Sequence, residues 1–256
     1  STELTMALFE LFIPREKLHP VSGPRAAEMT KMLENVFRSV NIALVNELLK
    51  LCDRMGIDFW EVIDAASTKP FGFMPFYPGP GVGGHCLPVD PYYLSWKARE
   101  YDFYTKFIEL AAEVNQSMPF YTVGKVIEAL NRQGRPLRGS KVLVLGAAFK
   151  RDIDDPRNSP AIQILEILAS RGAEVFYHDP YIPKVTLRAF SPDGGERTLE
   201  SVPLSESLLQ RMDCVLIAVA HSCFDIPWTV EHSRLIVDAQ NAAKRIRVGR
   251  EKIVKL

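Results

Sequence analysis

The chain has 256 residues, enough for one large domain or for two of ordinary size, each with its own core. Lys plus Arg and Asp plus Glu both total 31, so the overall charge does not favour nucleic acid or an anionic membrane surface as a partner. No apolar run reaches the roughly 18 residues of a membrane span, and the N-terminus lacks the order of a signal peptide. We therefore expect a cytoplasmic location and no membrane partner.

The first half of the sequence is predicted to be helical. Apolar residues at steps of three and four predict one long helix over residues 29–55, ended by Gly56. A second helical pattern covers residues 103–133, with Pro119 as a possible kink. It stops in GRPLRG, residues 134–139, beyond which the periodicity changes. We therefore expect a helical domain over residues 1–133 and a second domain over residues 134–256.

The first long helix carries more apolar residues than one stripe requires. Ile42, Ala43, Val45 and Leu49 widen its apolar surface. Part of that surface is therefore expected to meet a second copy of the chain, which predicts a homodimer.

The second half alternates strands with helices. KVLVLG and AEVFYHDP are typical of buried parallel strands, and SPAIQILEILASRG between them predicts a helix capped by Ser159 and stopped by Gly172. Two more strands are predicted in DCVLIAVA and RLIVDAQ, with short helices around residues 205–211 and 228–232. This pattern predicts a doubly wound, Rossmann-like α/β domain that binds ligands at the carboxyl ends of its strands.

The stretch FYPGPGVGGHCLPVDPYYL, residues 76–94, formally satisfies the GxGxxG pattern of a dinucleotide-binding loop. Its flanks do not fit that interpretation. Pro70, Pro75 and Pro78 are incompatible with a central strand before it, and Pro88 and Pro91 are expected to delay any helix after it. The glycines therefore require another explanation.

Cys86 directly follows these glycines, where a thiol has little side-chain cover. Asp90, four residues on, could hold or deprotonate a water beside it. His85 suggests a Cys/His pair, but adjacent side chains usually diverge, and one His-Cys pair supplies too few ligands for a metal. The four cysteines, at positions 52, 86, 214 and 223, show no disulfide or zinc spacing, and all but Cys86 are expected to be buried structural thiols.

Two further clusters have a functional and a structural interpretation. Lys31 and Asn35 share one helix face and could stabilise an oxyanion, or could simply face solvent. After the strand LVLG, the loop AAFKRDIDDPRNSP is not a dinucleotide loop, yet it places cations near a helix N-terminus, where phosphate oxygens bind. Its own aspartates could instead neutralise those cations. The segment 234–256, with seven Lys or Arg against two acids, is either a solvated face or a guide for an anionic ligand.

Four segments follow one another in a distinctive order: residues 26–52, residues 76–94, LGAAFKRDIDDPRNSPA and VFYHDPY. In this order they resemble the signatures of the UDP-glucose/GDP-mannose dehydrogenase family, from about Val21 to the C-terminus. GGHC followed by VDPYYL is most similar to the bacterial UDP-N-acetylhexosamine 6-dehydrogenases. The family's N-terminal NAD-binding domain has no counterpart here. The resemblance thus implies a central dimerisation domain and a C-terminal domain that closes over a UDP-sugar.

The resemblance also implies a mechanism in which NAD oxidises the C6 hydroxymethyl group of the UDP-sugar twice, giving a uronic acid for surface polysaccharide biosynthesis. Cys86 is the implied nucleophile, which forms a thiohemiacetal and then a thioester. Lys31 and Asn35 are implied to stabilise the oxyanion, and Asp90 to activate water. Arg157 is implied to lie near the cofactor phosphates. The implied substrate contacts are Tyr77, Gly79, Gly83, Phe149 and Lys150.

Two positions depart from the family pattern. Gln240 stands where many members have an arginine, and Val89 stands where the UDP-glucose enzymes have a lysine. Three alternatives to a UDP-N-acetylhexosamine dehydrogenase remain: UDP-glucose as the substrate, a UDP-sugar-binding and oligomerisation module without activity as given, and a hydrolase that uses Cys86 and His85.

Overall fold

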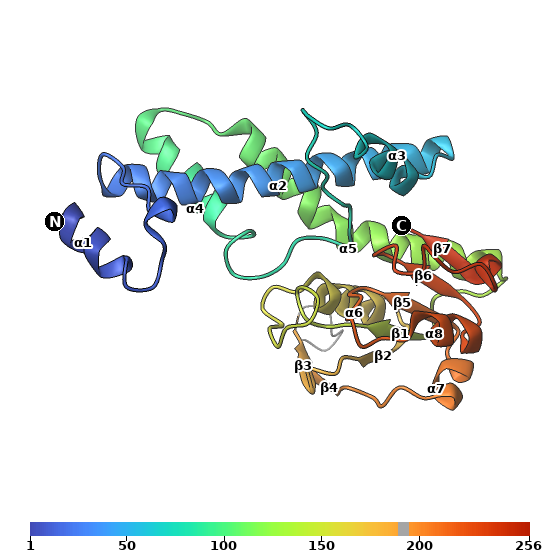
Figure 1. Ribbon diagram of the computed structural model, residues 1–256. Helices are drawn as coiled ribbons and strands as arrows, with labels where there is room; N and C mark the ends of the chain where they lie inside the picture. The colour runs from blue at the N-terminus through green and yellow to red at the C-terminus, as the bar shows by residue number, and fades with distance from the viewer. Residues whose placement is uncertain (189–194) are drawn as a thin grey trace.

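The structure, a computed structural model, describes residues 1–188 and 195–256 and consists of a helical part and an α/β part (Figure 1). The helices are α1 (Thr2–Phe9), α2 (Pro24–Met55), α3 (Phe59–Ala66), α4 (Asp90–Ala98), α5 (Lys106–Arg132), α6 (Pro160–Ser170), α7 (Glu206–Arg211) and α8 (Ile226–His232), with short 3₁₀ turns at Arg15–Lys17, Arg99–Tyr101 and Arg250–Lys252. The strands are β1 (Lys141–Leu145), β2 (Glu174–His178), β3 (Lys184–Leu187), β4 (Arg197–Glu200), β5 (Cys214–Ile217), β6 (Ile236–Asp238) and β7 (Ile253–Lys255). Within the described residues, no helix is both long and apolar enough to cross a membrane.

The main sheet has five strands in the order β2-β1-β5-β6-β7, and every neighbouring pair is parallel. Side chains alternate across it, as a strand's period of two requires. Val142 and Val144 pack in a core with α5 and α6, whereas Leu143 and Leu145 pack with α7 and α8. Helices therefore cover both faces, which confirms the predicted fold class. The antiparallel pair β3–β4 and the short strand β7 lie beyond the strands predicted from the sequence.

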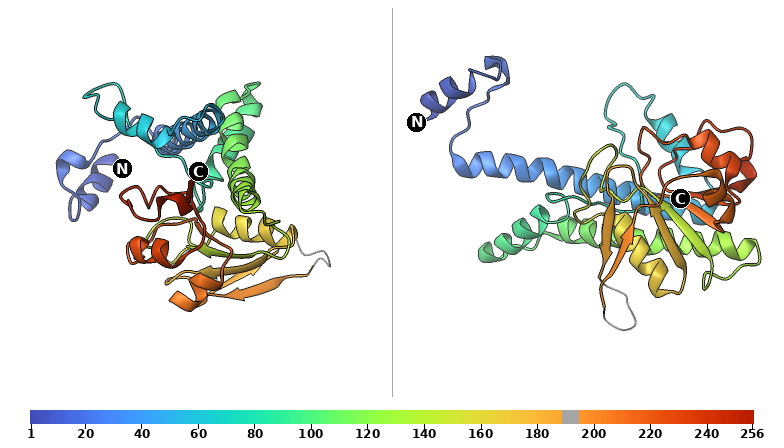
Figure 2. Two further views of the ribbon diagram at one scale, coloured as in Figure 1. Left: turned by 90° about the vertical axis from the view of Figure 1, so that its right-hand side faces the viewer. Right: turned by 90° about the horizontal axis from the view of Figure 1, so that it is seen from below.

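Helix α5 connects the two parts. It runs beside α2 in the helical part (Figure 2). Towards its C-terminal end, Val123, Val126 and Leu130 are fully buried in the same core as Val144 of β1. The change from helices to a parallel sheet follows Arg132, but the last turns of α5 cover that sheet.

Helix α2 begins at Pro24, five residues before the predicted start, and ends at the predicted Gly56, whose φ of +68° suits a residue without Cβ. Its buried face includes Asn35, Ser39 and Asn46, which lie 1%, 6% and 0% exposed. Asn46 Nδ2 donates to Asn115 Oδ1 of α5 (3.0 Å), and Asn115 Nδ2 donates to the carbonyl of Ser39 (3.1 Å). These hydrogen bonds satisfy the buried amides and fix which face of α2 meets α5.

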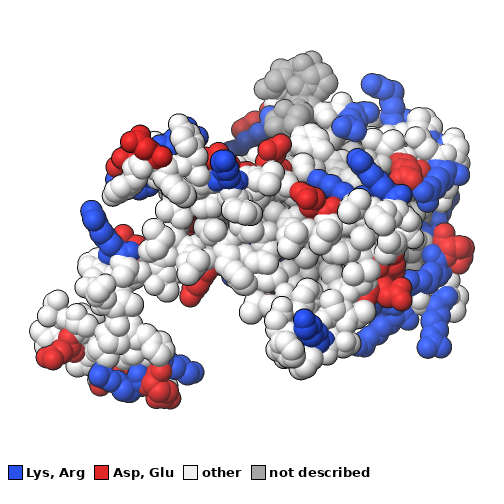
Figure 3. All heavy atoms as spheres, turned by 90° about the horizontal axis from the view of Figure 1, so that it is seen from above, with Lys and Arg blue, Asp and Glu red and all other residues white. Residues whose placement is uncertain are grey.

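The apolar stripe of α2 consequently lies on the outside. Leu33, Leu44, Leu48, Leu51 and Met55 are all exposed. The view from above shows that uncharged atoms cover most of the middle of the molecule (Figure 3). Of the residues that widen the apolar surface of α2, Ala43, Val45 and Leu49 are buried inside the chain, so they are not the part of that surface available to a second copy.

Candidate functional site

A cleft of about 1080 Å³ lies between the helical part and the carboxyl ends of the strands. From the α/β part, it is lined by the loops after β1, β5 and β6: residues 149–151, 218–220 and 240–242. From the helical part, it is lined by α2, α3 and residues 77–87. A parallel sheet binds its ligands at this edge. The cleft is therefore the candidate site.

Most of the predicted site residues meet in this cleft. Those that line it are Tyr77, Gly79, Gly83, Cys86, Phe149, Lys150 and Arg157. The Tyr77 ring stacks on Trp60 of α3, with ring centroids 6.1 Å apart. Gln240, the departure from the family arginine, also lines the cleft, and its Nε2 donates to the carbonyl of Ala218 (2.9 Å). Lys31, Asn35 and Asp90 are not among the lining residues.

The cleft lining is strongly basic. Its six cationic residues are Arg38, Lys150, Arg151, Arg157, Lys244 and Arg245, against the two acids Asp64 and Asp155. Lys244 and Arg245 belong to the basic segment 234–256, so part of that segment faces the cleft and is not merely a solvated face. Such a lining favours an anionic ligand.

The glycine segment is shaped by contacts within the protein. Gly79 N–H donates to Asn46 Oδ1 (3.0 Å). At Gly83, a Cβ would lie 2.7 Å from the carbonyl oxygen of Asn158 and 2.8 Å from the Phe149 side chain. This close approach requires glycine at position 83 whether or not a ligand is bound. No strand directly precedes the segment, so its match to a dinucleotide loop is accidental.

Cys86 lies exposed at the end of this segment, just before α4. As expected, no helix follows the glycines directly, and α4 begins at Asp90, after Pro88. Pro91 does not delay it, because Pro91 lies in the first turn, where the missing N–H costs nothing. The Cys86 carbonyl accepts a hydrogen bond from Asp90 N–H (2.8 Å). The start of α4 therefore holds the nucleophile candidate and Asp90 together.

Asp90 is also joined to α2. Asn35 Nδ2 donates to Asp90 Oδ2 over 2.8 Å, and Asn35 is 1% exposed. Three of the four predicted catalytic residues, Asn35, Cys86 and Asp90, are thus connected. Lys31 lies one turn earlier on α2, is exposed, and pairs with Glu34 over 3.3 Å. In this arrangement Lys31 faces solvent and does not line the cleft.

The loop after β1 pairs most of its own charges. Arg157 makes hydrogen bonds of 2.7 to 3.1 Å to both oxygens of Asp155, and these lower the pKa of Asp155 to about 2. The pKa of Arg157 is raised, first by its hydrogen bonds to Asp155 and by the charge of that carboxylate, and Cys86 lies close enough to contribute. Arg151 pairs with Asp152 (3.2 Å). Lys150 forms no ion pair within the described residues, and its Nζ lies 5.6 Å from the centre of the Phe149 ring.

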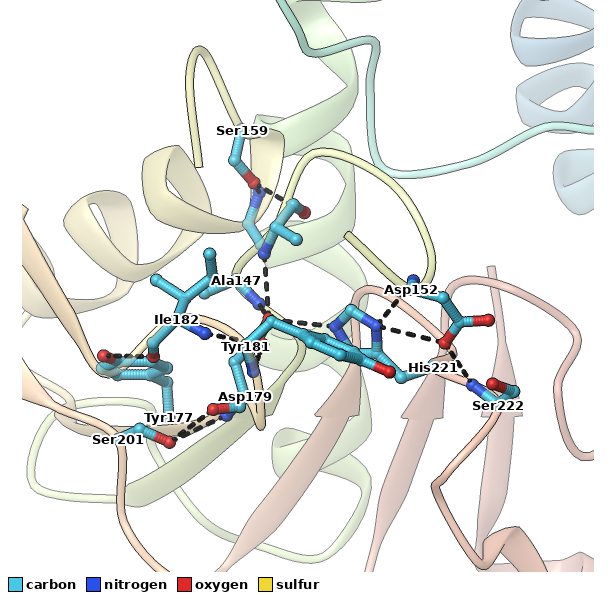
Figure 4. A network of polar contacts seen from close by, with 12 residues as sticks. Ala147, Asp152, Ser159, Tyr177, Asp179, Tyr181, Ile182, Ser201, His221 and Ser222 are labelled. Atoms are coloured by element: carbon cyan, nitrogen blue, oxygen red, sulfur yellow. Dashed lines mark hydrogen bonds and ion pairs between the residues drawn. The ribbon is translucent and has the colours of Figure 1, made fainter. Parts of the chain in front are cut away.

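A buried polar network that the sequence did not predict holds the start of this loop (Figure 4). Asp179, at the end of β2, accepts hydrogen bonds from Ala147 N–H (2.6 Å) and Ala148 N–H (3.0 Å) through Oδ2. His221 Nε2 lies 3.0 Å from the same oxygen, and His221 Nδ1 accepts from Asp152 N–H (3.0 Å). The aspartate in VFYHDPY was the available signal, but its partner His221 lies 42 residues away.

This network has two consequences. Burial alone would raise the pKa of Asp179, but hydrogen bonds from His221 and from backbone N–H groups outweigh it and lower the pKa to about 2. Asp179 is therefore a carboxylate at neutral pH. Because it occupies the amides of Ala147 and Ala148, these groups cannot hold a cofactor pyrophosphate in the way a dinucleotide loop does.

The other cysteines differ from each other. Cys214 is buried as expected, and its desolvation raises its pKa to about 12. Cys52 is half-buried. The expectation of a buried Cys223 is wrong, because Cys223 is exposed. The rings of its neighbours His221 and Phe224 pack together, with centroids 5.2 Å apart.

Among residues 1–188 and 195–256, no three His, Cys, Asp or Glu side chains are grouped to hold a metal.

Comparison with known proteins gives consistent matches. Residues 25–117 match the central domain of the UDP-glucose/GDP-mannose dehydrogenase family, and residues 143–245 match its UDP-binding domain. The chain is 36% identical to NDP-N-acetyl-D-galactosaminuronic acid dehydrogenase of Ralstonia nicotianae, over 96% of this chain and 55% of that protein. It is 36% identical to UDP-N-acetyl-D-glucosamine 6-dehydrogenase of Pseudomonas aeruginosa, over 80% of this chain and 46% of that protein.

The fold matches a solved structure as well. UDP-D-ManNAc dehydrogenase from Pyrococcus horikoshii superposes with a TM-score of 0.81 and 30% identity, over 99% of this chain and 56% of that one. The chain thus spans about half the length of the relatives it matches. The two domain matches, the relatives and the shared fold agree with the motifs of the cleft, and the chain belongs to the UDP-glucose/GDP-mannose dehydrogenase family, of which it carries the central and UDP-binding domains.

Proposed function

We propose that this chain is the nucleophile-bearing and UDP-sugar-binding part of an NAD-dependent 6-dehydrogenase. The observation that carries the proposal is the position of Cys86, an exposed thiol in a basic cleft at the carboxyl ends of a parallel sheet. The diphosphate of a UDP-sugar carries the negative charge that this lining favours. Cys86 is then available to the sugar at the end of the same cleft.

Within this proposal, Lys150 is the principal cation for the diphosphate. It is the lining residue of the loop after β1 that keeps its charge free of a carboxylate in the described residues, whereas Arg151 and Arg157 are paired. The ring of Phe149 makes a cation–π contact with the Lys150 ammonium group. Tyr77, stacked on Trp60, offers an aromatic surface, and Gly79 and Gly83 let the backbone line the cleft closely.

The proposed reaction proceeds through Cys86. The C6 alcohol loses a hydride from carbon and a proton from oxygen and becomes an aldehyde. The Cys86 thiolate adds to the aldehyde carbon, and the resulting oxyanion takes up a proton to give a thiohemiacetal. The thiohemiacetal then loses a hydride from carbon and a proton from oxygen to give a thioester. Water cleaves the thioester, releasing the carboxylate and the thiol. NAD, when bound, supplies the hydride acceptor for both oxidations.

The remaining catalytic roles follow from the contacts around Cys86. Asp90 is hydrogen-bonded to Asn35 and lies four residues after Cys86, where it orients or deprotonates the attacking water. Asn35 and Lys31 share one face of α2 and stabilise the oxyanion. Lys31 must leave its pair with Glu34 to do so, which costs little because both side chains are exposed.

We propose that NAD is bound mainly outside this chain. The loop after β1 lacks free amides for a pyrophosphate, because Asp179 occupies those of Ala147 and Ala148. Arg157, exposed in the cleft beside Asp155, is the residue here that suits a cofactor phosphate. The chain alone would then bind a UDP-sugar and remain inactive, as in the alternative of a binding and oligomerisation module.

For the sugar, we propose a UDP-N-acetylhexosamine, with UDP-glucose as the alternative. The segment GGHC followed by VDPYYL supports this choice, because it is most similar to the enzymes that oxidise UDP-N-acetylhexosamines. The product, a UDP-linked uronic acid, would serve surface polysaccharide biosynthesis. A reducing cytoplasm suits the exposed thiol of Cys86, since a free cysteine nucleophile is inactivated by oxidation.

We also propose a homodimer. The stripe of Leu33, Leu44, Leu48, Leu51 and Met55 on α2 is exposed along the length of a 32-residue helix. An apolar stripe at helical spacing is the face that another helix covers, and a second copy brings an identical stripe.

The test compares Cys86→Ser with Cys223→Ser, a matched change at the other exposed cysteine. With NAD and UDP-N-acetylhexosamines, the holoenzyme carrying Cys86→Ser should bind substrate normally but form no acid. A serine hydroxyl is a much weaker nucleophile than a thiolate, so the covalent adduct needed for the second oxidation does not form. Cys223→Ser should behave as the parent. Normal acid formation by Cys86→Ser would refute the covalent mechanism, and acid formation from UDP-glucose alone would select the alternative substrate.

A further inference from the structure

The segment that carries Cys86 is fastened to the α/β part at Gly84. Gly84 N–H donates to the carbonyl of Arg157 (3.0 Å), and Asn158 Nδ2 donates to the carbonyl of Gly84 (3.0 Å). Gly84 is buried with φ +90°, and a Cβ there would lie 2.8 Å from the Phe149 ring. Both polar groups of Gly84 are therefore held by the loop after β1, two residues before the nucleophile.

The other side of Cys86 is fastened to the helical part. Its carbonyl accepts from Asp90 N–H, and the Asp90 carboxylate accepts from Asn35 of α2. Cys86 thus lies between one attachment to each part of the molecule. The Gly84 attachment relates the thiol to the loop that carries Phe149 and Lys150.

The backbone on either side of Asn158 is itself well fixed. Asn158 has φ +51°, a left-handed conformation that Asn adopts far more readily than most residues. The next residue, Ser159, is 4% exposed and caps α6: its Oγ accepts from Ala161 N–H (3.2 Å) and donates to the carbonyl of Ala148 (3.1 Å). At the start of the loop, Asp179 and His221 hold Ala147 and Asp152. The Asn158 amide therefore projects from a loop fixed at both ends.

From these contacts we infer that Asn158 is a positioning residue for Cys86: its Nδ2 holds the Gly84 carbonyl and so sets the place of the thiol relative to Arg157 and Lys150. The effect on turnover rests on the proposed function, whereas the effect on the thiol does not. Cys86 is already exposed, so loss of the attachment does not improve access to it. It instead releases the segment that carries the thiol from the loop that holds Arg157 and Lys150, so the surroundings of the thiol change.

Two variants remove the hydrogen bond while keeping the left-handed backbone. Asn158→Asp has the same shape but no donor, and Asn158→Gly has no side chain and tolerates the same φ. Asn131→Asp, the same amide-to-acid change at an exposed position of α5, is the control. The first readout is the rate at which iodoacetamide alkylates Cys86, divided by the rate at which it alkylates Cys223 in the same chain. Peptide mass spectrometry measures both rates.

Both Asn158 variants should change this ratio by about threefold or more at neutral pH, with unchanged circular dichroism, while Asn131→Asp leaves it unchanged. In the holoenzyme, kcat should fall by about tenfold or more while the KM for UDP-sugar changes little, because a misplaced nucleophile affects the chemical step. An unchanged ratio in both variants would overturn the inference.

The two proposals fail in different ways. If the parent holoenzyme oxidises no UDP-sugar but the alkylation ratio still changes in both Asn158 variants, the proposed function is wrong and the positioning role stands. If the parent is active and the Asn158 variants keep both its kcat and its alkylation ratio, the positioning role is wrong and the function stands.

Discussion

Asn35 and Asp90 are 55 residues apart in the chain, yet Asn35 Nδ2 donates to Asp90 Oδ2 over 2.8 Å. The bond joins the middle of α2 to the first residue of α4, whose backbone N–H in turn holds the carbonyl of Cys86. This polar contact therefore helps to hold Cys86 in place relative to the helical part.

Asn35→Ala should weaken both folding and turnover. The variant removes the partner of Asp90 inside a nearly fully buried position, so the free energy of unfolding should fall by about 1–2 kcal/mol. Turnover by the holoenzyme should fall on the order of a hundredfold, because oxyanion stabilisation is lost as well. Asn41→Ala is the control: within residues 1–188 and 195–256, its amide bonds only to the Phe37 carbonyl of its own helix. Equal losses in both variants would show that Asn35 only supports the helix.

Lys150→Ala should abolish most of the protection that UDP gives against heat. A ligand at a hundred times its dissociation constant stabilises the folded chain by about 2.7 kcal/mol, which a thermal unfolding scan detects. We expect UDP to protect the parent chain and NAD to protect it little. Lys184→Ala, on β3 and outside the cleft lining, should retain full UDP protection. Equal protection of the parent by NAD alone would contradict the assignment of the cleft.

Asp179 should make the chain sensitive to acid. Its pKa in the folded chain is about 2, below the 3.8 of an unperturbed aspartate. A lowered pKa gives stability that is fully present above about pH 4 and is lost as the pH falls through 2, with a size of about 2 kcal/mol. Urea unfolding of the parent and Asp179→Asn at several pH values measures this. The difference in unfolding free energy should be largest at neutral pH and should shrink below pH 4, whereas a constant difference would contradict the prediction.

Leu44→Glu combined with Leu48→Glu should convert a dimer into a monomer. Both side chains are exposed on the outer stripe of α2, and a buried carboxylate in a dimer interface has no partner there. Light scattering at micromolar concentration gives the mass. Val248→Glu is the control, since Val248 is 89% exposed at a position far along the chain from α2. A parent chain that is already monomeric would contradict the proposed homodimer.

The sequence by itself determined the elements whose signals are local. Gly56 ends α2 because only a residue without Cβ adopts its left-handed φ easily, and Ser159 begins α6 because its hydroxyl accepts from the helix amide of Ala161. The buried strands β1, β2, β5 and β6 were predictable from unbroken apolar runs. The exposure of Cys86 followed from the glycines before it. Strand β7, with three half-buried residues, carries no comparable signal.

Only the tertiary structure decided which face of α2 is buried. Periodicity marks an apolar stripe but does not say what covers it. Here Asn35 and Asn46 turn inward, where Asp90 of α4 and Asn115 of α5 offer them hydrogen-bond partners. The attachments of the site have the same origin. Asn158 reaches Gly84 across 74 residues and His221 reaches Asp179 across 42, and neither residue type carries a local signal for a partner so distant. Such pairs form only when packing brings distant segments of the chain together, because the free energy of each bond depends on burial that the local sequence does not encode.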